Sequence, residues 1–286
     1  MENYYDFCQD SYLKEYQSNY EKLGASFPGG KIPSSKLNEI EAESQKAAMK
    51  NTFMAATNIY ANVSPAEIWK AIHIAHMYRK TNIKDLNLIS TIVSADQSWK
   101  KSSGHAFEET VKEFSNIALA GTNIKVILQK DLTSLLKAKT LANENRDYDW
   151  LKAKVKSSVF DLFVLVSEND KQYCFGCIQA KTSVRDRVTR DREPSIDAMA
   201  SFFWSVIFVL DDEFLKLPKF IDMVNGGTQE FQENGWHGMY ALSENKYDER
   251  IYGIGIDFER FKKHAQKAAK LWLTQRQWFD NTWIAE

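Results

Sequence analysis

This sequence has no long apolar run, which limits the classes of protein it can form. Its longest apolar stretch, residues 202–210, contains Ser205 and is far shorter than the ~18 apolar residues that cross a bilayer. The first six residues are acidic and aromatic, whereas a secretory signal begins with basic residues and continues with an apolar segment. We therefore expect neither a membrane span nor a signal peptide.

Cysteine is also scarce. The three cysteines are Cys8, Cys174 and Cys177, an odd number that does not suit the disulfide framework of a small secreted protein. Cys174 and Cys177 lie three positions apart on an expected strand, so their side chains should point to opposite faces and not converge on a metal. The sequence has no second Cys-x-x-Cys pair to complete a zinc site. We expect buried structural cysteines in a protein of the reducing cytoplasm.

Neither sign of charge is in excess, since 37 Lys and Arg residues face 38 Asp and Glu residues. This balance excludes a uniformly basic nucleic-acid coat but allows a local basic cleft. A hydrophobic fraction of 44% and a charged fraction of 26% exclude a disordered tail, a collagen-like repeat and a coiled-coil rod. The 286 residues suffice for one large domain, or for a core domain with a smaller companion.

Residues 1–100 predict a mainly helical region. Residues 64–67, Ser-Pro-Ala-Glu, form a capping box with proline at the first helical position, which predicts a helix start. Apolar residues recur at helical spacing after it, and further helices are expected around residues 37–48 and 86–93.

Residues 101–286 predict a core in which helices and strands alternate. The apolar spacing changes after Ser102-Ser103-Gly104. We expect helices at residues 107–118, 131–144, 196–210 and 257–276. We expect strands at residues 159–166, 172–180, 239–242 and 251–256, and residues 124–128 form a short apolar run. This order is typical of an α/β fold, or of a layered α+β fold.

Two of these strands bring polar residues together. Residues 159–166 and 172–180 predict an antiparallel hairpin, in which residues equidistant from the turn face each other. Asp161 then lies opposite position 178 or 179. Gln179 and Lys181 are two positions apart and share a face of their strand. A carboxylate, an amide and an ammonium group therefore gather at one end of the hairpin.

These groups suit a phosphodiesterase site. Carboxylate and amide oxygens are ligands for Mg²⁺, an ion that activates water and offsets charge on a phosphate during in-line displacement. A lysine beside such an ion can orient or deprotonate the attacking water. The alternative is a structural ion pair between Asp161 and Lys181, because charges at the ends of apolar strands are costly unless they are paired.

The same residues carry a resemblance. Phe160-Asp161 followed by Gln179-Ala180-Lys181 resembles the PD-(D/E)XK nuclease motif, with Phe in place of Pro and Gln in place of the second acid. Residues 103–109 are similar to the helix that precedes this motif in type II restriction endonucleases, where a helical glutamate faces the metal site. By this likeness Glu108 takes that role, with Glu109 as the alternative. The resemblance covers roughly residues 100–195.

The resemblance implies a restriction-endonuclease-like core over residues 101–286, a mixed sheet flanked by helices and ending in a basic helix. It implies that Glu108, Asp161, Gln179 and the Ala180 carbonyl hold Mg²⁺, or Mn²⁺ as a substitute. Lys181 would position the attacking water. Gln179 would be a metal ligand or would orient its neighbours. Because its amide is neutral and binds a cation more weakly than a carboxylate, Glu108 becomes more necessary for holding the metal ion.

The resemblance also implies a substrate. It implies a homodimer that cuts both strands of double-stranded DNA at a short palindromic site and leaves 5′-phosphates, since a two-fold protein mirrors a palindrome. Residues 1–100 would serve DNA contact, dimerisation or both. Two alternatives remain open: a repair or junction nuclease of the same superfamily, and an inactive DNA-binding module on a decayed nuclease fold. No helicase, methyltransferase or ATPase motif is visible in the sequence, which favours a nuclease that acts alone.

The segment after Lys181 is rich in arginine and hydroxyl side chains. Arginine holds phosphates or reads guanine, and Ser and Thr hydroxyls commonly contact phosphates. The alternative is a solvated loop in which Arg and Asp side chains pair. We expect DNA contacts from Thr182, Ser183, Arg185, Arg187, Arg190 and Arg192.

Overall fold

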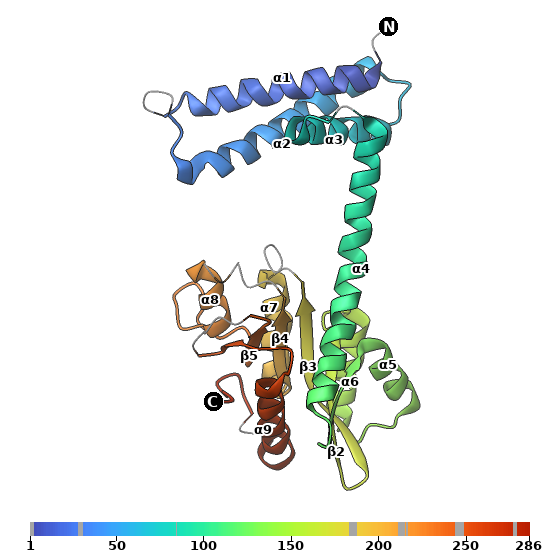
Figure 1. Ribbon diagram of the computed structural model, residues 1–286, viewed down its shortest axis with the longest axis vertical. Helices are drawn as coiled ribbons and strands as arrows, with labels where there is room; N and C mark the ends of the chain where they lie inside the picture. The colour runs from blue at the N-terminus through green and yellow to red at the C-terminus, as the bar shows by residue number, and fades with distance from the viewer. Residues whose placement is uncertain are drawn as a thin grey trace. The chain divides into compact units, whose positions relative to one another are not determined.

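The computed structural model describes residues 3–27, 31–83, 85–182, 188–210, 215, 217–243, 249–276 and 279–286. Contacts divide the chain into two compact units, Met1–Trp99 and Lys100–Glu286. Helix α4 (Leu86–Ala118) passes through the boundary between them (Figure 1). Among the described residues, no helix combines the length and the apolar character needed to cross a membrane.

The first unit is helical, as expected. The helices before α4 are α1 (Tyr4–Gly24), α2 (Ser34–Ile59) and α3 (Pro65–Thr81). The side chain of Ser64 accepts the backbone N–H of Glu67 at 3.2 Å, which confirms the predicted cap of α3. The hydroxyl of Tyr12 hydrogen-bonds Nδ1 of His76 at 2.8 Å and so joins α1 to α3. Cys8 is fully buried in the same core.

The second unit is built on a six-stranded mixed sheet in the order β1-β2-β3-β4-β5-β6. Its strands are β1 (Ile124–Leu128), β2 (Leu162–Glu168), β3 (Lys171–Lys181), β4 (Trp204–Val209), β5 (Gly238–Ala241) and β6 (Ile251–Gly253). The pairs β1–β2 and β2–β3 are antiparallel, whereas β3, β4, β5 and β6 are parallel. The carboxyl ends of these four parallel strands therefore lie along one edge of the sheet.

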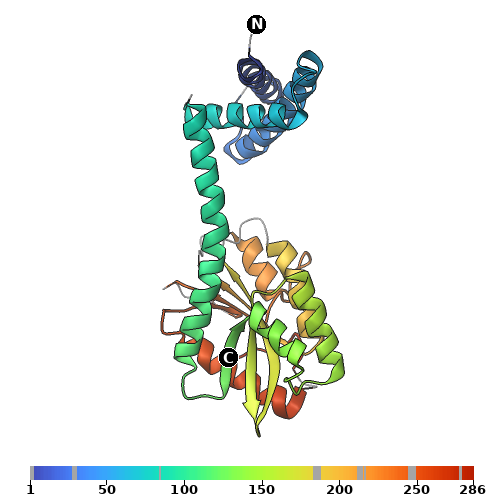
Figure 2. The same cartoon turned by 90° about the vertical axis from the view of Figure 1, so that its right-hand side faces the viewer.

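Helices cover both faces of this sheet (Figure 2). One face packs against the second half of α4 and against α9 (Glu259–Gln275). The opposite face packs against α5 (Gln129–Ala138), α6 (Asn145–Ser157), α7 (Val188–Ala200) and α8 (Pro218–Asn225). This three-layer arrangement confirms the expected fold class, a mixed sheet flanked by helices.

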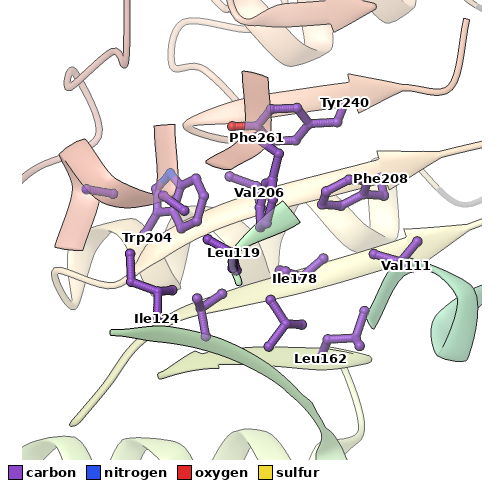
Figure 3. Packing of buried hydrophobic residues seen from close by; sticks show 14 of the residues in the cluster. Val111, Leu119, Ile124, Leu162, Ile178, Trp204, Val206, Phe208, Tyr240 and Phe261 are labelled. Carbon is purple, nitrogen blue, oxygen red and sulfur yellow. The ribbon is translucent and has the colours of Figure 1, made fainter. Parts of the chain in front are cut away.

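Figure 3 shows the apolar core on the face that α4 and α9 cover. Val111 comes from α4 and Phe261 from α9, and they meet Ile178, Val206 and Phe208 from the central strands. All five side chains have no exposed surface. Burial of each such side chain contributes about 1.5–3 kcal/mol, so this core fixes β3 against the second half of α4.

The expected helix over residues 196–210 is wrong in its second half. Helix α7 ends at Ala200, and Trp204–Val209 forms strand β4. β4 lies between two parallel neighbours and is covered on both faces, so its sequence is continuously apolar and lacks the alternation of a half-exposed strand.

Other helices also differ from the sequence prediction. Helices α6 (Asn145–Ser157) and α8 (Pro218–Asn225) were not expected, and α5 ends at Ala138 instead of residue 144. α4 continues through Ser102-Ser103-Gly104, because one glycine inside a helix costs only about 1 kcal/mol relative to alanine. A helix of 33 residues tolerates that cost.

The β2–β3 hairpin has the predicted turn and register. Asn169 and Asp170 adopt φ angles of 50° and 59°, the left-handed conformation of a tight hairpin turn. Leu162 pairs with Ile178, which places Asp161 opposite Gln179. The sequence therefore correctly predicted which residues meet at the open end of the hairpin.

The expectation for Cys174 and Cys177 is half wrong. Both are free and fully buried, as predicted, but they belong to the same core cluster instead of facing opposite sides. The register shifts between Val164 and Leu165, and this bulge interrupts the alternation of β3. Burial raises the pKa of both thiols.

Candidate active site

Asp161 and Lys181 meet at the open end of the hairpin. Oδ2 of Asp161 accepts hydrogen bonds from the Ala180 N–H at 2.7 Å and from Lys181 Nζ at 2.9 Å. The backbone of Asp161 is held as well, because its N–H donates to the Ile178 carbonyl at 3.0 Å. The side chains of Asp161 and Lys181 are only 16% and 19% exposed. The pair is therefore fixed in place, yet it reaches the surface at the carboxyl edge of the sheet.

Glu108 brings a second carboxylate to this edge. Burial raises its pKa above the ordinary value, and the charge of Asp161 raises it further. His105, whose Nδ1 lies 3.4 Å from Oε2, and Lys181 act in the opposite direction. The two carboxylates thus repel each other in a partly desolvated place, which a cation between them would relieve.

The structure separates Glu108 from Glu109, which the sequence left open. Glu109 is 47% exposed and pairs with Lys112 at 2.6 Å and with Lys130 at 3.5 Å. The Lys112 ammonium lowers the pKa of Glu109. Only Glu108 is coupled electrostatically to Asp161 and Lys181.

The residues at this edge fit a magnesium ion. Within the described part of the chain, no group of three or more His, Cys, Asp and Glu side chains is placed to hold a metal. Mg²⁺ does not need such a cage, because it is commonly bound through one or two carboxylates and keeps several waters. Glu108 and Asp161 can supply those carboxylates.

Gln179 is buried and fully engaged. Its side chain has no exposed surface, and Nε2 donates to the Val159 carbonyl at 3.2 Å and to the Asp191 carbonyl at 2.9 Å. Its oxygen accepts the indole N–H of Trp236 at 2.7 Å. Of the two roles that the sequence left open, ligand or orienter, these contacts support the orienter. The amide ties β3 to the residues just before Asp161 and to the first turn of α7.

The basic segment after Lys181 is only partly described. Ser183, Arg185 and Arg187 lie outside the described residues. Thr182 is half-buried directly after Lys181, and Arg190 is exposed in the first turn of α7.

The side chain of Arg192 is used within the fold. Its guanidinium donates to the carbonyl of Met223 at 3.2 Å and to that of Glu233, and it stacks over the Phe231 ring. Burial lowers its pKa. These contacts support a structural role for Arg192 in place of the DNA contact expected from the sequence.

Sequence reasoning missed the residues that hold the site together. Trp236 is 57 positions from Gln179, and no motif marks it. His105 was part of the matched helix, but only its position one turn from Glu108 makes it a neighbour of that carboxylate. Such partners are set by packing, so a single sequence carries no local signal for them.

A mixed sheet between helical layers, with an Asp–Lys pair and a helical Glu at one edge, defines a restriction-endonuclease-like nuclease core. Residues 147–278 match the model of the BsaWI restriction endonuclease type 2 family. The crystal structure of the pre-specific BsaWI–DNA complex contains a chain that is 48% identical over 99% of both chains, with a TM-score of 0.82. The protein belongs to the BsaWI restriction endonuclease family and is a type II restriction endonuclease.

A second solved structure also matches. A chain of the specific AgeI–DNA complex is 18% identical, with coverage of 89% of this chain and 91% of that chain and a TM-score of 0.45. No curated protein matches this chain. Restriction endonucleases of this kind generally use a divalent metal.

Proposed function

We propose that this enzyme uses Mg²⁺ to cleave both strands of duplex DNA at a short palindromic site and leaves 5′-phosphates. The hydrogen bond of 2.9 Å between Lys181 and Asp161, beside the electrostatically coupled Glu108, is the observation that carries this proposal. The BsaWI relative was crystallised with DNA, which supports duplex DNA as the partner here.

Each residue has a role in this proposal. Asp161, Glu108 and the Ala180 carbonyl would hold Mg²⁺, with Mn²⁺ as a substitute. The bound ion supplies an activated water and offsets charge on the scissile phosphate. Lys181, held by Asp161, would orient or deprotonate the attacking water, and in-line displacement of the 3′ oxygen would leave the phosphate on the 5′ end. Gln179 keeps the strand that carries Lys181 in register with the segment before Asp161.

The DNA contacts and the assembly are part of the same proposal. Thr182, Ser183, Arg185, Arg187 and Arg190 would contact DNA, and residues 1–100 would serve DNA contact, dimerisation or both. A homodimer would match the two-fold symmetry of a palindrome. The odd cysteine count supports a cytoplasmic location.

Lys181→Ala tests the site. We expect cleavage to fall by about 100-fold or more, because the water loses its orienting group, while duplex binding changes only a few-fold. Lys171→Ala, an exposed lysine at the opposite end of β3, is the matched control and should cleave like the wild type. Both quantities follow from timed plasmid digests and fluorescence anisotropy. Normal cleavage by Lys181→Ala would contradict the assignment of the active site.

A further inference from the structure

A basic pocket lies at the start of α9, apart from the Asp161 site. It has a volume of about 530 Å³ and lies between the end of β6 and the first turns of α9. Arg260, Lys263, His264 and Lys267 line it from one face of the helix, since they are spaced by three or four residues. Lys263 forms no ion pair with any residue that the structure describes.

A carboxylate already occupies this pocket. Both side-chain oxygens of Glu286 accept hydrogen bonds from the Arg260 guanidinium, at 2.7 Å each, and Oε1 lies 3.2 Å from Nε2 of His264. Lys267 Nζ donates to the Ala285 carbonyl at 2.7 Å. The two parallel bonds from Arg260 are the geometry in which arginine also binds phosphate.

Two other acids line the pocket but do not fill it. Oδ1 of Asp257 accepts the backbone N–H of Glu259 at 3.3 Å, and Glu259 pairs with Lys262 at 3.6 Å. The occupant that neutralises Arg260 is Glu286, whose side chain is 47% exposed.

The pocket stands in line with the candidate active site. Lys181 pairs with Val209, Val209 with Ala241, and Ala241 with Gly253, which lines the pocket. Three strand spacings separate Lys181 from Gly253, or about 14 Å. That offset is similar to the width of the major groove, about 12 Å. The pocket therefore lies along the same edge of the sheet as Lys181, within the span of a duplex bound there.

We propose that this pocket binds a backbone phosphate of the DNA duplex, and that Glu286 is an internal competitor that leaves when DNA binds. The proposal rests on the proposed DNA cleavage function. It assigns Arg260, Lys263 and Lys267 to phosphate contact outside the basic segment after Lys181. A backbone phosphate suits the pocket better than a free phosphate ion because the bound duplex presents it in a fixed position.

Anisotropy titrations in EDTA, where no cleavage occurs, test this on a mixed-sequence duplex over a series of salt concentrations. We expect Glu286→Gln to bind about threefold to tenfold more tightly, because the competing charge is gone. Lys263→Ala should bind more weakly and lower the slope of log affinity against log salt by about 1. Glu230→Gln, an exposed glutamate paired with Lys219, is the control and should match the wild type.

The outcomes are distinct. If Glu286→Gln and Lys263→Ala both bind DNA with the affinity and salt slope of the wild type, the pocket does not bind a DNA phosphate. The proposed nuclease function would remain intact. Absence of duplex binding by the wild type would overturn both. Stabilisation by inorganic phosphate that requires Lys263, without any change in the DNA salt slope, would assign the pocket to free phosphate and contradict the DNA contact. Melting curves of each variant verify folding, and Lys263→Ala removes no ion pair with a described residue.

Discussion

At the residue scale, a substitution of Gln179 separates two possible roles of this side chain: a metal ligand, or a structural clamp that holds β3 in place. Its two amide hydrogens face the carbonyls of Val159 and Asp191. In Gln179→Glu both donors are replaced by an acceptor, and a buried charge would face two carbonyl oxygens. We expect a loss of about 2–4 kcal/mol in unfolding free energy and weaker cleavage. Urea unfolding and Mg²⁺ titration of cleavage measure both.

A ligand role predicts the reverse for Gln179→Glu, since an added carboxylate would strengthen Mg²⁺ binding. Trp236→Phe is the companion variant, because it removes the N–H that the Gln179 oxygen accepts, together with part of a fully buried ring, and adds no charge. We expect it to cost about 1–3 kcal/mol and to leave the Mg²⁺ requirement unchanged. A lower Mg²⁺ requirement in Gln179→Glu would show that the clamp assignment is wrong.

The raised pKa of Glu108 should make the stability of the protein depend on pH. Burial and Asp161 raise its folded pKa above 4.5, so the ionised carboxyl opposes folding at neutral pH in the absence of metal. Glu108→Gln should therefore unfold at higher urea than the wild type at pH 7, and the gain should vanish as pH falls below 4.5. Its cleavage should fall by about 100-fold, since the proposed metal ligand is lost.

Glu109→Gln is the matched control for this experiment. The pKa of Glu109 is lowered by Lys112, so the sign reverses and the variant should lose stability at pH 7. That loss should disappear as pH falls through the lowered pKa. If the stabilities of Glu108→Gln and Glu109→Gln depend on pH in the same way, the two glutamates do not have the different environments described above.

At the element scale, one ion pair joins α6 to the end of α9. Arg276 donates to both oxygens of Asp147, at 2.8 Å and 2.6 Å, and Asp147 is only 1% exposed. Arg276→Ala leaves that carboxylate buried without its cation, so we expect a loss of about 3–5 kcal/mol. Lys270→Ala, on an exposed position of α9, should change stability by no more than about 0.5 kcal/mol.

Chemical denaturation at neutral pH measures this pair of variants. An Arg276→Ala protein as stable as Lys270→Ala would show that the ion pair does not hold α6 and α9 together. Partial recovery in the double variant Asp147→Asn, Arg276→Ala would identify the unpaired carboxylate as the cause of the loss.

Element prediction failed where burial hides periodicity. β4 is covered on both faces, so its apolar run is equally compatible with a buried helix. Helix α6 is a different case, because Tyr148, Leu151 and Val155 recur at helical spacing and pack against the core, so the pattern was present in the sequence and was overlooked. The hairpin was predictable because Asn169-Asp170 favour a left-handed turn between two apolar strands.

At the scale of the whole molecule, the expected activity is site-specific cleavage. A digest of large mixed-sequence DNA with Mg²⁺ should give discrete fragments whose ends share one short palindrome, and EDTA should abolish them. Sequencing of the termini identifies the site and should find 5′-phosphates. A smear would point to a non-specific or structure-selective nuclease, and intact DNA with every divalent ion would favour a DNA-binding module on a decayed fold.

The sequence by itself determined the motif, the hairpin and the pairing of Asp161 with Lys181. These features are local: turn residues and strand alternation fix which positions face each other within 21 residues, from Asp161 to Lys181. The same reasoning gave the helical N-terminal region and the cap of α3, because capping depends on four consecutive residues.

Only the tertiary structure decided which polar side chains meet one another. It couples Glu108 and not Glu109 electrostatically to Asp161, binds Gln179 to Trp236, and turns Arg192 towards carbonyl oxygens. It also moved Cys174 and Cys177 to one face through a bulge. Each outcome depends on groups that meet across the sheet from distant parts of the chain, and burial, not spacing, sets whether a polar side chain is free to act.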